Sequence, residues 1–150
     1  MLIVKTATVQ DVQTLIHFGK RLTVESPNFC NQGFNETLAV QFFTHLIEHS
    51  KSVFIIFDEN NPIGTLVGEI GLCWRTGQTL AFEHGLYVLP KYRKTGAASM
   101  LIEHYMVWIS QKNVDRLQLG TMTGIHADKT IQLYEKHGLK LTGYVLEKEI

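Results

Sequence analysis

The most constraining feature of the sequence is a change of hydrophobic period at Pro90. Residues 79–89 have the apolar, turn-bounded character of a strand. After the proline, apolar side chains recur at helical spacing, at Ala98, Leu101, Ile102, Tyr105, Met106 and Ile109. A strand that passes through a short loop into an amphipathic helix requires a fold in which helices pack on a sheet.

Weaker signals on both sides extend this pattern to an α+β fold with a mixed, mostly antiparallel sheet and about four helices. Thr8 and Asp11 resemble a capping box, Asn35 can cap a second helix, and Gly138 can end the last one. The expected strands are residues 2–7, 52–57, 63–74, 79–89, 116–120 and 141–149; the expected helices follow Asp11 and Asn35 and span 98–109 and 129–137.

Composition limits the class of protein. The 150 residues, 45% of them hydrophobic, can form one domain over 1–150 with a substantial core. Fourteen basic residues balance fourteen acidic ones, so nucleic acids and anionic membranes are disfavoured partners. We find no membrane-length apolar run and no signal-peptide core, and the two cysteines match no metal or redox spacing, so we expect a cytoplasmic protein.

The loop after Pro90 has the chemistry of an anion site. Gly96 and Ala97 let a ligand approach the backbone, and the N–H groups at the start of the next helix favour negative charge. Arg93 and Lys94 add positive side chains. Any strand-to-helix turn favours small residues, so these features alone leave pyrophosphate binding and an ordinary turn as alternatives.

Two motifs resemble the GNAT acetyltransferases. Residues 93–98, Arg-Lys-Thr-Gly-Ala-Ala, fit the R/Q-x-x-G-x-G/A signature of that family, and they follow an apolar strand, residues 86–90. Residues 133–139, Leu-Tyr-Glu-Lys-His-Gly-Leu, are similar to its Leu-Tyr-Glu-Lys-x-Gly-Phe segment. The sequence departs from the family pattern at Ala98, Ala127 and Thr130, which weakens side-chain contacts and leaves a backbone cradle intact.

The resemblance implies a GNAT-like fold whose middle strands splay apart around the pantetheine arm of acetyl-CoA, the acetyl donor. The residues implied to bind the cofactor are Leu86, Val88, Arg93, Lys94, Thr95, Gly96, Ala97 and Ala98. The occurrence together of residues 25–29, Glu-Ser-Pro-x-Phe, and residues 123–125, Thr-Gly-Ile, further resembles compact stand-alone GNAT proteins of bacteria and phages. The implied activity is direct transfer of an acetyl group to a primary amine of a small molecule or a protein.

Such a transfer needs a base, because an alkylamine with a pKa of about 10.4 is almost entirely protonated at neutral pH. Glu83 and His84 precede Val88 on one strand, and Gly85 can mark a bulge that turns one of them into the cleft. We favour Glu83, acting directly or through a water molecule, over His84. Both also fit ordinary roles, a solvated carboxylate and a packing imidazole.

Two further roles follow from the resemblance. The oxyanion would lie near the N–H of Val88, and Tyr134 matches the tyrosine that supplies a proton or hydrogen bond to the departing thiolate. A core aromatic is the alternative for Tyr134. In this fold class the acceptor enters opposite the cofactor, and Glu25, Asn28 and Phe29 are the expected walls of its site.

Several alternatives stay open. His45, Glu48 and His49 spell H-x-x-E-H, but the helix is short and a third ligand is missing, so we predict no metal. A different acyl-CoA donor, a non-catalytic CoA-binding regulatory or interaction module, and an acetyltransferase acting on charged tRNA are the rival functions. An exposed C-terminal strand would allow a homodimer.

Overall fold

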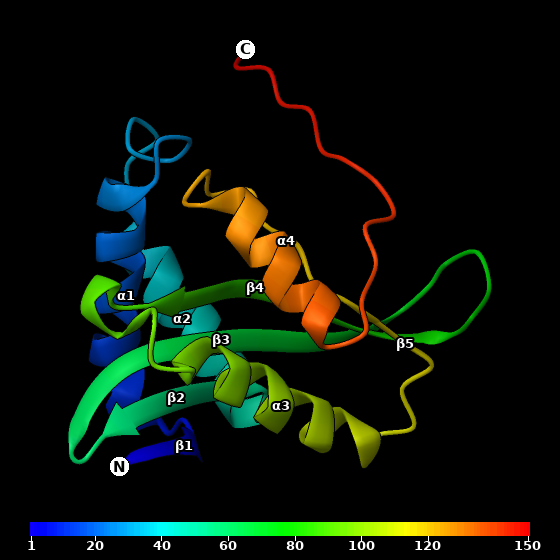
Figure 1. Cartoon of the computed structure of the whole chain (residues 1–150), viewed down its shortest axis with the longest axis horizontal. Coiled ribbons are helices and arrows are strands. Elements are labelled where there is room, and N and C mark those ends of the chain that lie inside the picture. The colour runs from blue at the N-terminus through cyan, green and yellow to red at the C-terminus, as the bar shows by residue number, and fades with distance from the viewer.

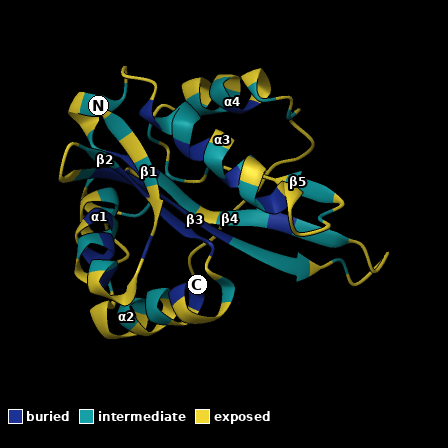
Figure 2. Cartoon of the chain, turned by 90° about the horizontal axis from the view of Figure 1, so that it is seen from below, coloured by how far each residue is buried: buried dark blue, intermediate teal, exposed yellow.

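The protein is a five-stranded sheet with two helices on each face, seen in a computed structural model that describes residues 1–150. The strands lie in the order β1-β2-β3-β4-β5. Helices α1 and α2 cover one face, and α3 and α4 cover the other (Figures 1 and 2). Their bounds are β1 Leu2–Thr6, α1 Val12–Glu25, α2 Glu36–His45, β2 Val53–Asp58, β3 Asn61–Leu72, β4 Thr79–Val88, α3 Ala97–Ser110, β5 Arg116–Gln118 and α4 Ala127–Lys136.

The sheet is mixed because only its last pair of strands is parallel. β1, β2, β3 and β4 form an antiparallel meander, and β5 then runs parallel to β4. The parallel pairing covers three residues of each strand and ends at Phe82 and Gln118. The carboxyl half of β4 therefore has β3 on one side and no strand on the other, which is the splay that the sequence implied.

Each face of the sheet has its own apolar core. The core under α3 and α4 joins Phe54, Leu66 and Ala81 of the sheet to Leu101 and Tyr105 of α3. The core under α1 and α2 joins Val53, Ile55 and Val67 to Leu15, Ile16 and Phe18 of α1, with Tyr87 of β4. Successive strand residues point to opposite faces, so the unbroken apolar run of β2, residues 53–57, supplies both cores.

The helix boundaries follow the predicted capping residues. The Thr8 N–H donates to Oδ2 of Asp11 at 2.8 Å, as in a capping box, and the Asn35 side chain accepts from the Leu38 N–H at 3.0 Å. Gly138, with φ of +90°, follows α4 and lets the chain turn away. The helices of this chain all lack the length and apolar character that crossing a bilayer requires.

The predicted C-terminal strand, residues 141–149, is wrong: residues 139–150 form no strand. Beyond Leu139 no backbone N–H of this segment donates to another backbone group. Its apolar residues do not keep a strict period of two, since Tyr144, Val145 and Leu146 are consecutive after Gly143. Strand β5 is also shorter than predicted, 116–118 rather than 116–120, and so offers only a short edge for pairing.

Candidate functional site

The free edge of β4 is the centre of the candidate site. Leu89 donates its N–H to Ile63 of β3 at 2.8 Å. Backbone groups of a strand alternate in direction, so those of Val88 and Leu86 point to the opposite edge, which β5 leaves unpaired beyond Phe82. Leu86 and Val88, which the resemblance implied as cofactor-binding residues, thus lie on a strand edge whose backbone groups are free for hydrogen bonds.

The loop after β4 presents backbone donors at the start of α3. Gly96 has φ of +83°, and an added Cβ would meet nothing within 4 Å, so the surface there is open to a ligand. The N–H groups of Gly96, Ala97, Ala98 and Ser99 donate to no acceptor within the chain. Unsatisfied amides at a helix N-terminus fit a pyrophosphate, and the residues present therefore fit the coenzyme that the sequence implied.

The side chains of the loop have more varied roles. Thr95 donates its hydroxyl to the Tyr92 carbonyl, and Lys94 is exposed without an ion pair. Arg93 instead turns back onto the chain: its Nε donates to the Val88 carbonyl at 2.9 Å, and its two terminal nitrogens bind both carboxylate oxygens of Glu25, Nη2 to Oε2 at 2.7 Å. The guanidinium thus ties the loop to the end of α1.

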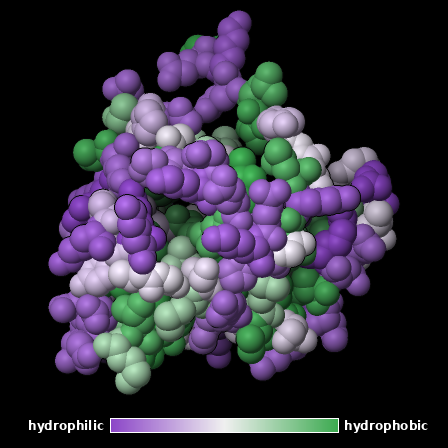
Figure 3. All heavy atoms as spheres, viewed as in Figure 1, coloured by the Kyte–Doolittle hydropathy of each residue, from purple (hydrophilic) through white to green (hydrophobic).

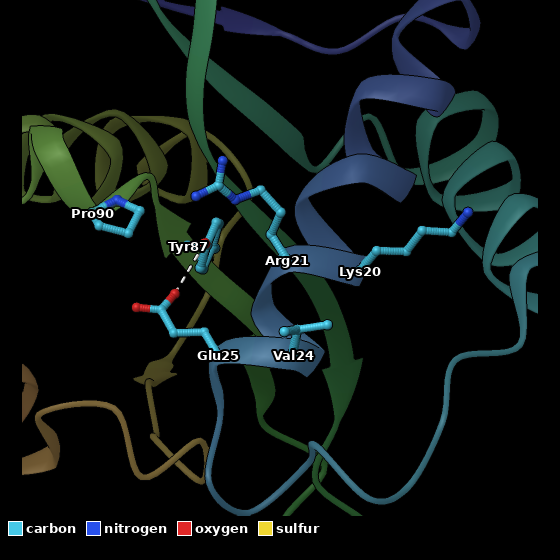
Figure 4. A pocket seen from close by; sticks show the side chains of 6 residues that line it. All are labelled: Lys20, Arg21, Val24, Glu25, Tyr87 and Pro90. Atoms are coloured by element: carbon cyan, nitrogen blue, oxygen red, sulfur yellow. Dashed lines mark hydrogen bonds between the residues drawn. The ribbon is translucent and has the colours of Figure 1, made fainter.

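This fork-like ion pair changes what Glu25 can do. The hydrogen bonds from Arg93 hold the pKa of the Glu25 carboxyl below its usual value, and the Tyr87 hydroxyl also donates to it at 3.0 Å. A shallow cavity of about 410 Å³ borders the pair, lined by Lys20, Arg21, Val24, Glu25, Tyr87 and Pro90 (Figure 4). Glu25 lies at the predicted place, but its charge is already matched within the chain.

The other two predicted acceptor residues belong to a loop that docks across the site. Asn28 donates through Nδ2 to the Met122 carbonyl at 2.8 Å, and Ser26 donates through Oγ to the Thr123 carbonyl at 2.5 Å. Phe29 is half-buried in the same loop. The structure therefore joins the segment after α1 to the segment after β5, a contact that the sequence did not predict.

Glu83 lies where the two strands separate. Its Oε1 accepts the Gly120 N–H at 2.8 Å, and Gly120 follows the last paired residue of β5 by two positions. Burial raises the pKa of the Glu83 carboxyl from 4.5 to about 7, against the opposing effect of that single hydrogen bond. No cation forms an ion pair with it. A carboxylate with a pKa near neutrality is suited to take up a proton.

Tyr134 of α4 reaches the same residue from the other side. Its hydroxyl donates to the Gly120 carbonyl at 3.3 Å, and its side chain is buried. Burial, and the nearby negative charge of Glu83, raise the pKa of the Tyr134 phenol well above its usual value. The phenol therefore keeps its proton near neutral pH and can donate it in a hydrogen bond. The two predicted catalytic residues, Glu83 and Tyr134, thus both contact Gly120. The sequence had predicted Gly120 as the last residue of a strand, 116–120.

His84 points to the opposite face of the sheet. The pairing of β3 with β4 shifts between Val67 and Gly68 and skips His84, so the bulge expected beside Gly85 is present. The His84 Nε2 lies 2.5 Å from Oε2 of Glu69 on β3, and its ring meets the Phe42 ring of α2 edge-on at 4.8 Å. Sequence analysis missed Glu69, because only strand register places it beside His84, fifteen residues away.

The H-x-x-E-H segment lies where α2 passes into a π-helical turn, Leu46–Ser50. The ring of His45, at the end of α2, and that of His49, in the turn, have centroids 4.6 Å apart and are tilted by 42° to each other. The chain contains no group of three or more histidine, cysteine, aspartate or glutamate side chains arranged to hold a metal ion. Both histidines are exposed.

Comparison with known proteins agrees with this geometry. The sequence pattern of the Acetyltransferase (GNAT) family matches residues 20–139. No curated protein matches the chain in sequence. Its fold is similar to that of a predicted acetyltransferase from Clostridium acetobutylicum, crystallised with acetyl-CoA, at 18% identity and a TM-score of 0.76, covering 99% of this chain and 96% of that one.

Two further solved structures share the fold. Glucosamine-6-phosphate N-acetyltransferase from Arabidopsis thaliana is 14% identical, with a TM-score of 0.75 and coverage of 99% of this chain and 98% of that one. An aminoglycoside acetyltransferase from an uncultured soil metagenomic sample is 15% identical, with a TM-score of 0.75 and coverage of 100% and 99%. At these identities the similarity shows the fold alone.

Proposed function

Because the chain belongs to the acetyltransferase (GNAT) family, we propose that it is an acetyl-CoA-dependent N-acetyltransferase. It transfers the acetyl group directly to a primary amine of a small molecule or a protein. The coenzyme supplies an acetyl group activated as a thioester. The free N–H groups that begin α3 would hold its pyrophosphate, and the unpaired edge of β4 at Leu86 and Val88 would hold its pantetheine arm. We place this single domain, residues 1–150, in the cytoplasm.

Glu83 is the proposed base. An amine attacks only when it is neutral, and Glu83 can accept its proton because no cation in the chain forms an ion pair with the carboxylate. At pH 7 a group with a pKa of about 7 is deprotonated in roughly half of the molecules, so its proton affinity matches the task. The N–H of Gly120 keeps the carboxylate in place between the two strands.

Two other groups complete the proposed mechanism. The Val88 N–H points to the free edge of β4 and would stabilise negative charge on the acetyl oxygen during transfer. Tyr134 keeps its proton at neutral pH and would donate to the leaving sulfur from the side opposite Glu83. No covalent attachment to the chain is required, since holding the amine beside the thioester supplies much of the acceleration.

The observation that carries this proposal is the convergence of Glu83 and Tyr134 on Gly120 at the splay of the two strands. The test is calorimetric titration with acetyl-CoA, followed by a thiol-release screen over primary amines. We expect Glu83→Gln to bind acetyl-CoA normally and to lose about 10²- to 10⁴-fold in kcat. If Glu83→Gln has the same kcat as the unmodified chain, Glu83 is not the base. Coenzyme binding without thiol release from any amine would instead favour a non-catalytic CoA-binding module.

We also propose that the chain forms a homodimer through its C-terminal segment, residues 139–150. Its apolar side chains are largely exposed, Tyr144 at 83%, Val145 at 69% and Leu146 at 91%, and the segment projects from the body at the top of Figure 3. The exposed apolar side chains of two copies can pack against one another through this segment and so be buried.

Light scattering of the full chain tests the dimer. We expect twice the monomer mass for the unmodified chain. The double variant Val145→Asp, Leu146→Asp should be a monomer, because a charged side chain opposes burial in the contact between the two copies. Lys148→Ala, in the same segment, is the matched control and should leave the dimer intact. A full-length chain that is monomeric at all accessible concentrations contradicts the dimer.

A further inference from the structure

Tyr105 of α3 fills the space on the sheet directly across from Glu83. Gly68 of β3 is the paired neighbour of Glu83 on β4, and it has no side chain. An added Cβ on Gly68 would lie 2.5 Å from Cε1 and Cζ of the Tyr105 ring and 2.6 Å from its hydroxyl oxygen. Tyr105 is completely buried, at 0% exposure. Its ring therefore occupies the place that a cross-strand side chain would take beside Glu83.

The Tyr105 hydroxyl is directed at the backbone of the two strands. It donates to the Phe82 carbonyl at 2.7 Å and also reaches the Glu69 carbonyl at 3.3 Å. A phenol has a single proton to donate, so Tyr105 has none left for the Glu83 carboxylate. Phe82 directly precedes Glu83, so the hydrogen bond holds the backbone of β4 beside the point where the strand pairing shifts.

The groups around Glu83 enclose its carboxylate without adding positive charge. Two titratable side chains face it from the helices, the phenols of Tyr105 on α3 and Tyr134 on α4. Burial and the nearby negative charge of Glu83 raise the pKa of both phenols. Both donate their protons to main-chain carbonyls. β3 contributes Gly68, and the segment after β5 contributes the N–H of Gly120, the one hydrogen bond that the carboxylate accepts.

This arrangement differs from the usual way of stabilising a buried carboxylate. A cation or several hydrogen-bond donors would favour the charged form and lower its affinity for a proton, as Arg93 does for Glu25. Tyr105 excludes solvent on the side of β3 and supplies neither a cation nor a donor. Burial, opposed by a single backbone hydrogen bond, then raises the pKa of the Glu83 carboxyl to about 7.

We propose that Tyr105 is a positioning residue for Glu83, with its ring excluding solvent from the carboxylate and its hydroxyl fixing the backbone of β4 beside it. Tyr105 acts through Glu83 and contacts neither the coenzyme nor the amine. The inference rests on the proposed function for the task of Glu83 as the base. It rests on the geometry of Gly68, Tyr105 and Glu83 for the way in which the proton affinity of that base is set.

The first test measures the titration of Glu83 without coenzyme or amine. Carbon-13 NMR of the full-length chain, labelled at its glutamate carboxyls, follows the signal that Glu83→Gln lacks. We expect a midpoint near pH 7 in the unmodified chain. Tyr105→Leu leaves a space lined by polar groups that water can fill, and the added Cβ of Gly68→Ala displaces the ring. Each should lower the midpoint by at least about one pH unit, and Tyr105→Phe, which keeps the ring, should not change it.

Ile109→Ala is the matched control. Ile109 lies on α3 four residues after Tyr105, is 8% exposed and belongs to the same core. Its truncation removes a buried side chain of that core and should leave the Glu83 midpoint unchanged. An unchanged midpoint in Tyr105→Leu or in Gly68→Ala would overturn the inference, and Gly68→Ala decides alone if Tyr105→Leu does not fold. A midpoint near 4.5 in the unmodified chain would overturn it as well.

Kinetics then separate the inference from the proposed function. With acetyl-CoA and an amine found by thiol release, the pH midpoint of kcat in Gly68→Ala should fall together with the NMR midpoint. Tyr105→Phe should lower kcat about 3- to 10-fold with the affinity for acetyl-CoA unchanged, because the Phe82 carbonyl loses the donor that fixes it. Unchanged kcat in Tyr105→Phe would overturn the role of the hydroxyl. An NMR midpoint that depends on Tyr105, without thiol release from any amine, would leave the control of Glu83 by Tyr105 standing and refute the proposed function.

Discussion

Two glutamates near the ends of the free half of β4 have opposite electrostatic environments. Glu25 meets the guanidinium of Arg93 with both carboxylate oxygens, and hydrogen bonding to it lowers the pKa of that carboxyl. Glu83 is more deeply enclosed, accepts one backbone N–H and has no cationic partner, so burial raises the pKa of its carboxyl to about 7. One residue type thus yields a permanent anion at one end and a proton acceptor at the other.

The contrast shows that the partner, more than the position near the cleft, decides the role of each carboxylate. Glu25 ties the loop after β4 to α1 and leaves the Arg93 side chain only 26% exposed. Glu83 is held in an enclosed place where its charged form is costly, which favours the uptake of a proton. The two glutamates should therefore differ in three measurements: the pH dependence of the free energy of unfolding, kcat, and the coupling free energy with a neighbouring residue.

The largest expected effect is on stability as a function of pH. The pKa of Glu83 is raised on folding, so the folded chain binds more protons than the unfolded chain between about pH 4.5 and 7, and stability falls as pH rises through that window. Urea unfolding should show Glu83→Gln gaining about 2–3 kcal/mol relative to the unmodified chain between pH 5 and pH 8. The exposed Glu103→Gln is the control and should gain nothing.

A stability difference that is independent of pH would contradict the contrast between Glu83 and Glu25. A stability difference between Glu83→Gln and the unmodified chain that does not change between pH 5 and pH 8 would mean that Glu83 ionises in the folded chain as it does in the unfolded one. Glu83 would then be an ordinary carboxylate, and the case for a base at the splay would be lost.

A smaller effect is expected at Tyr134. Tyr134→Phe removes the hydroxyl that donates to Gly120 and, in the proposed mechanism, to the leaving sulfur. We expect kcat to fall about 10-fold while the affinity for acetyl-CoA, measured by calorimetry, stays the same, because the ring still packs in the core. Phe82→Tyr, which adds a hydroxyl on the other face, should not restore the rate. Unchanged kcat in Tyr134→Phe would make the ring purely structural.

The sequence predicted the part of the site that depends on local order. The strand, loop and helix around Pro90 are contiguous, and their periods and small residues are sufficient to predict the turn at Gly96 and the bulge beside Gly85. Glu83 was predicted from its place on the strand before Val88 and Tyr134 from the resemblance, yet their meeting at Gly120 depends on how far β5 pairs with β4, which no local pattern records.

The pairings that the sequence did not predict join residues far apart in the chain. Arg93 and Glu25 are 68 positions apart, and each fits a ligand role until the fold brings them together. Glu69 is found only through the register of β3 with β4. The error at residues 141–149 has a related cause, since a run of strand-forming residues forms a strand only where an edge accepts it, and β5 is three residues long.

The smallest expected effect is the coupling free energy between Glu25 and Arg93. It measures how strongly the ion pair holds Glu25, the glutamate that was compared with Glu83. A double-mutant cycle with Glu25→Gln and Arg93→Gln, measured by urea unfolding, should give about 1 kcal/mol, because the side chains are only 28% and 26% exposed but still border solvent. Glu25→Gln should leave the pH midpoint of kcat unmoved, since its carboxyl is already ionised wherever Glu83 titrates. A coupling near zero would mean that Glu25 is free to bind the acceptor, and a shifted midpoint would mean that the two glutamates share the proton-accepting role.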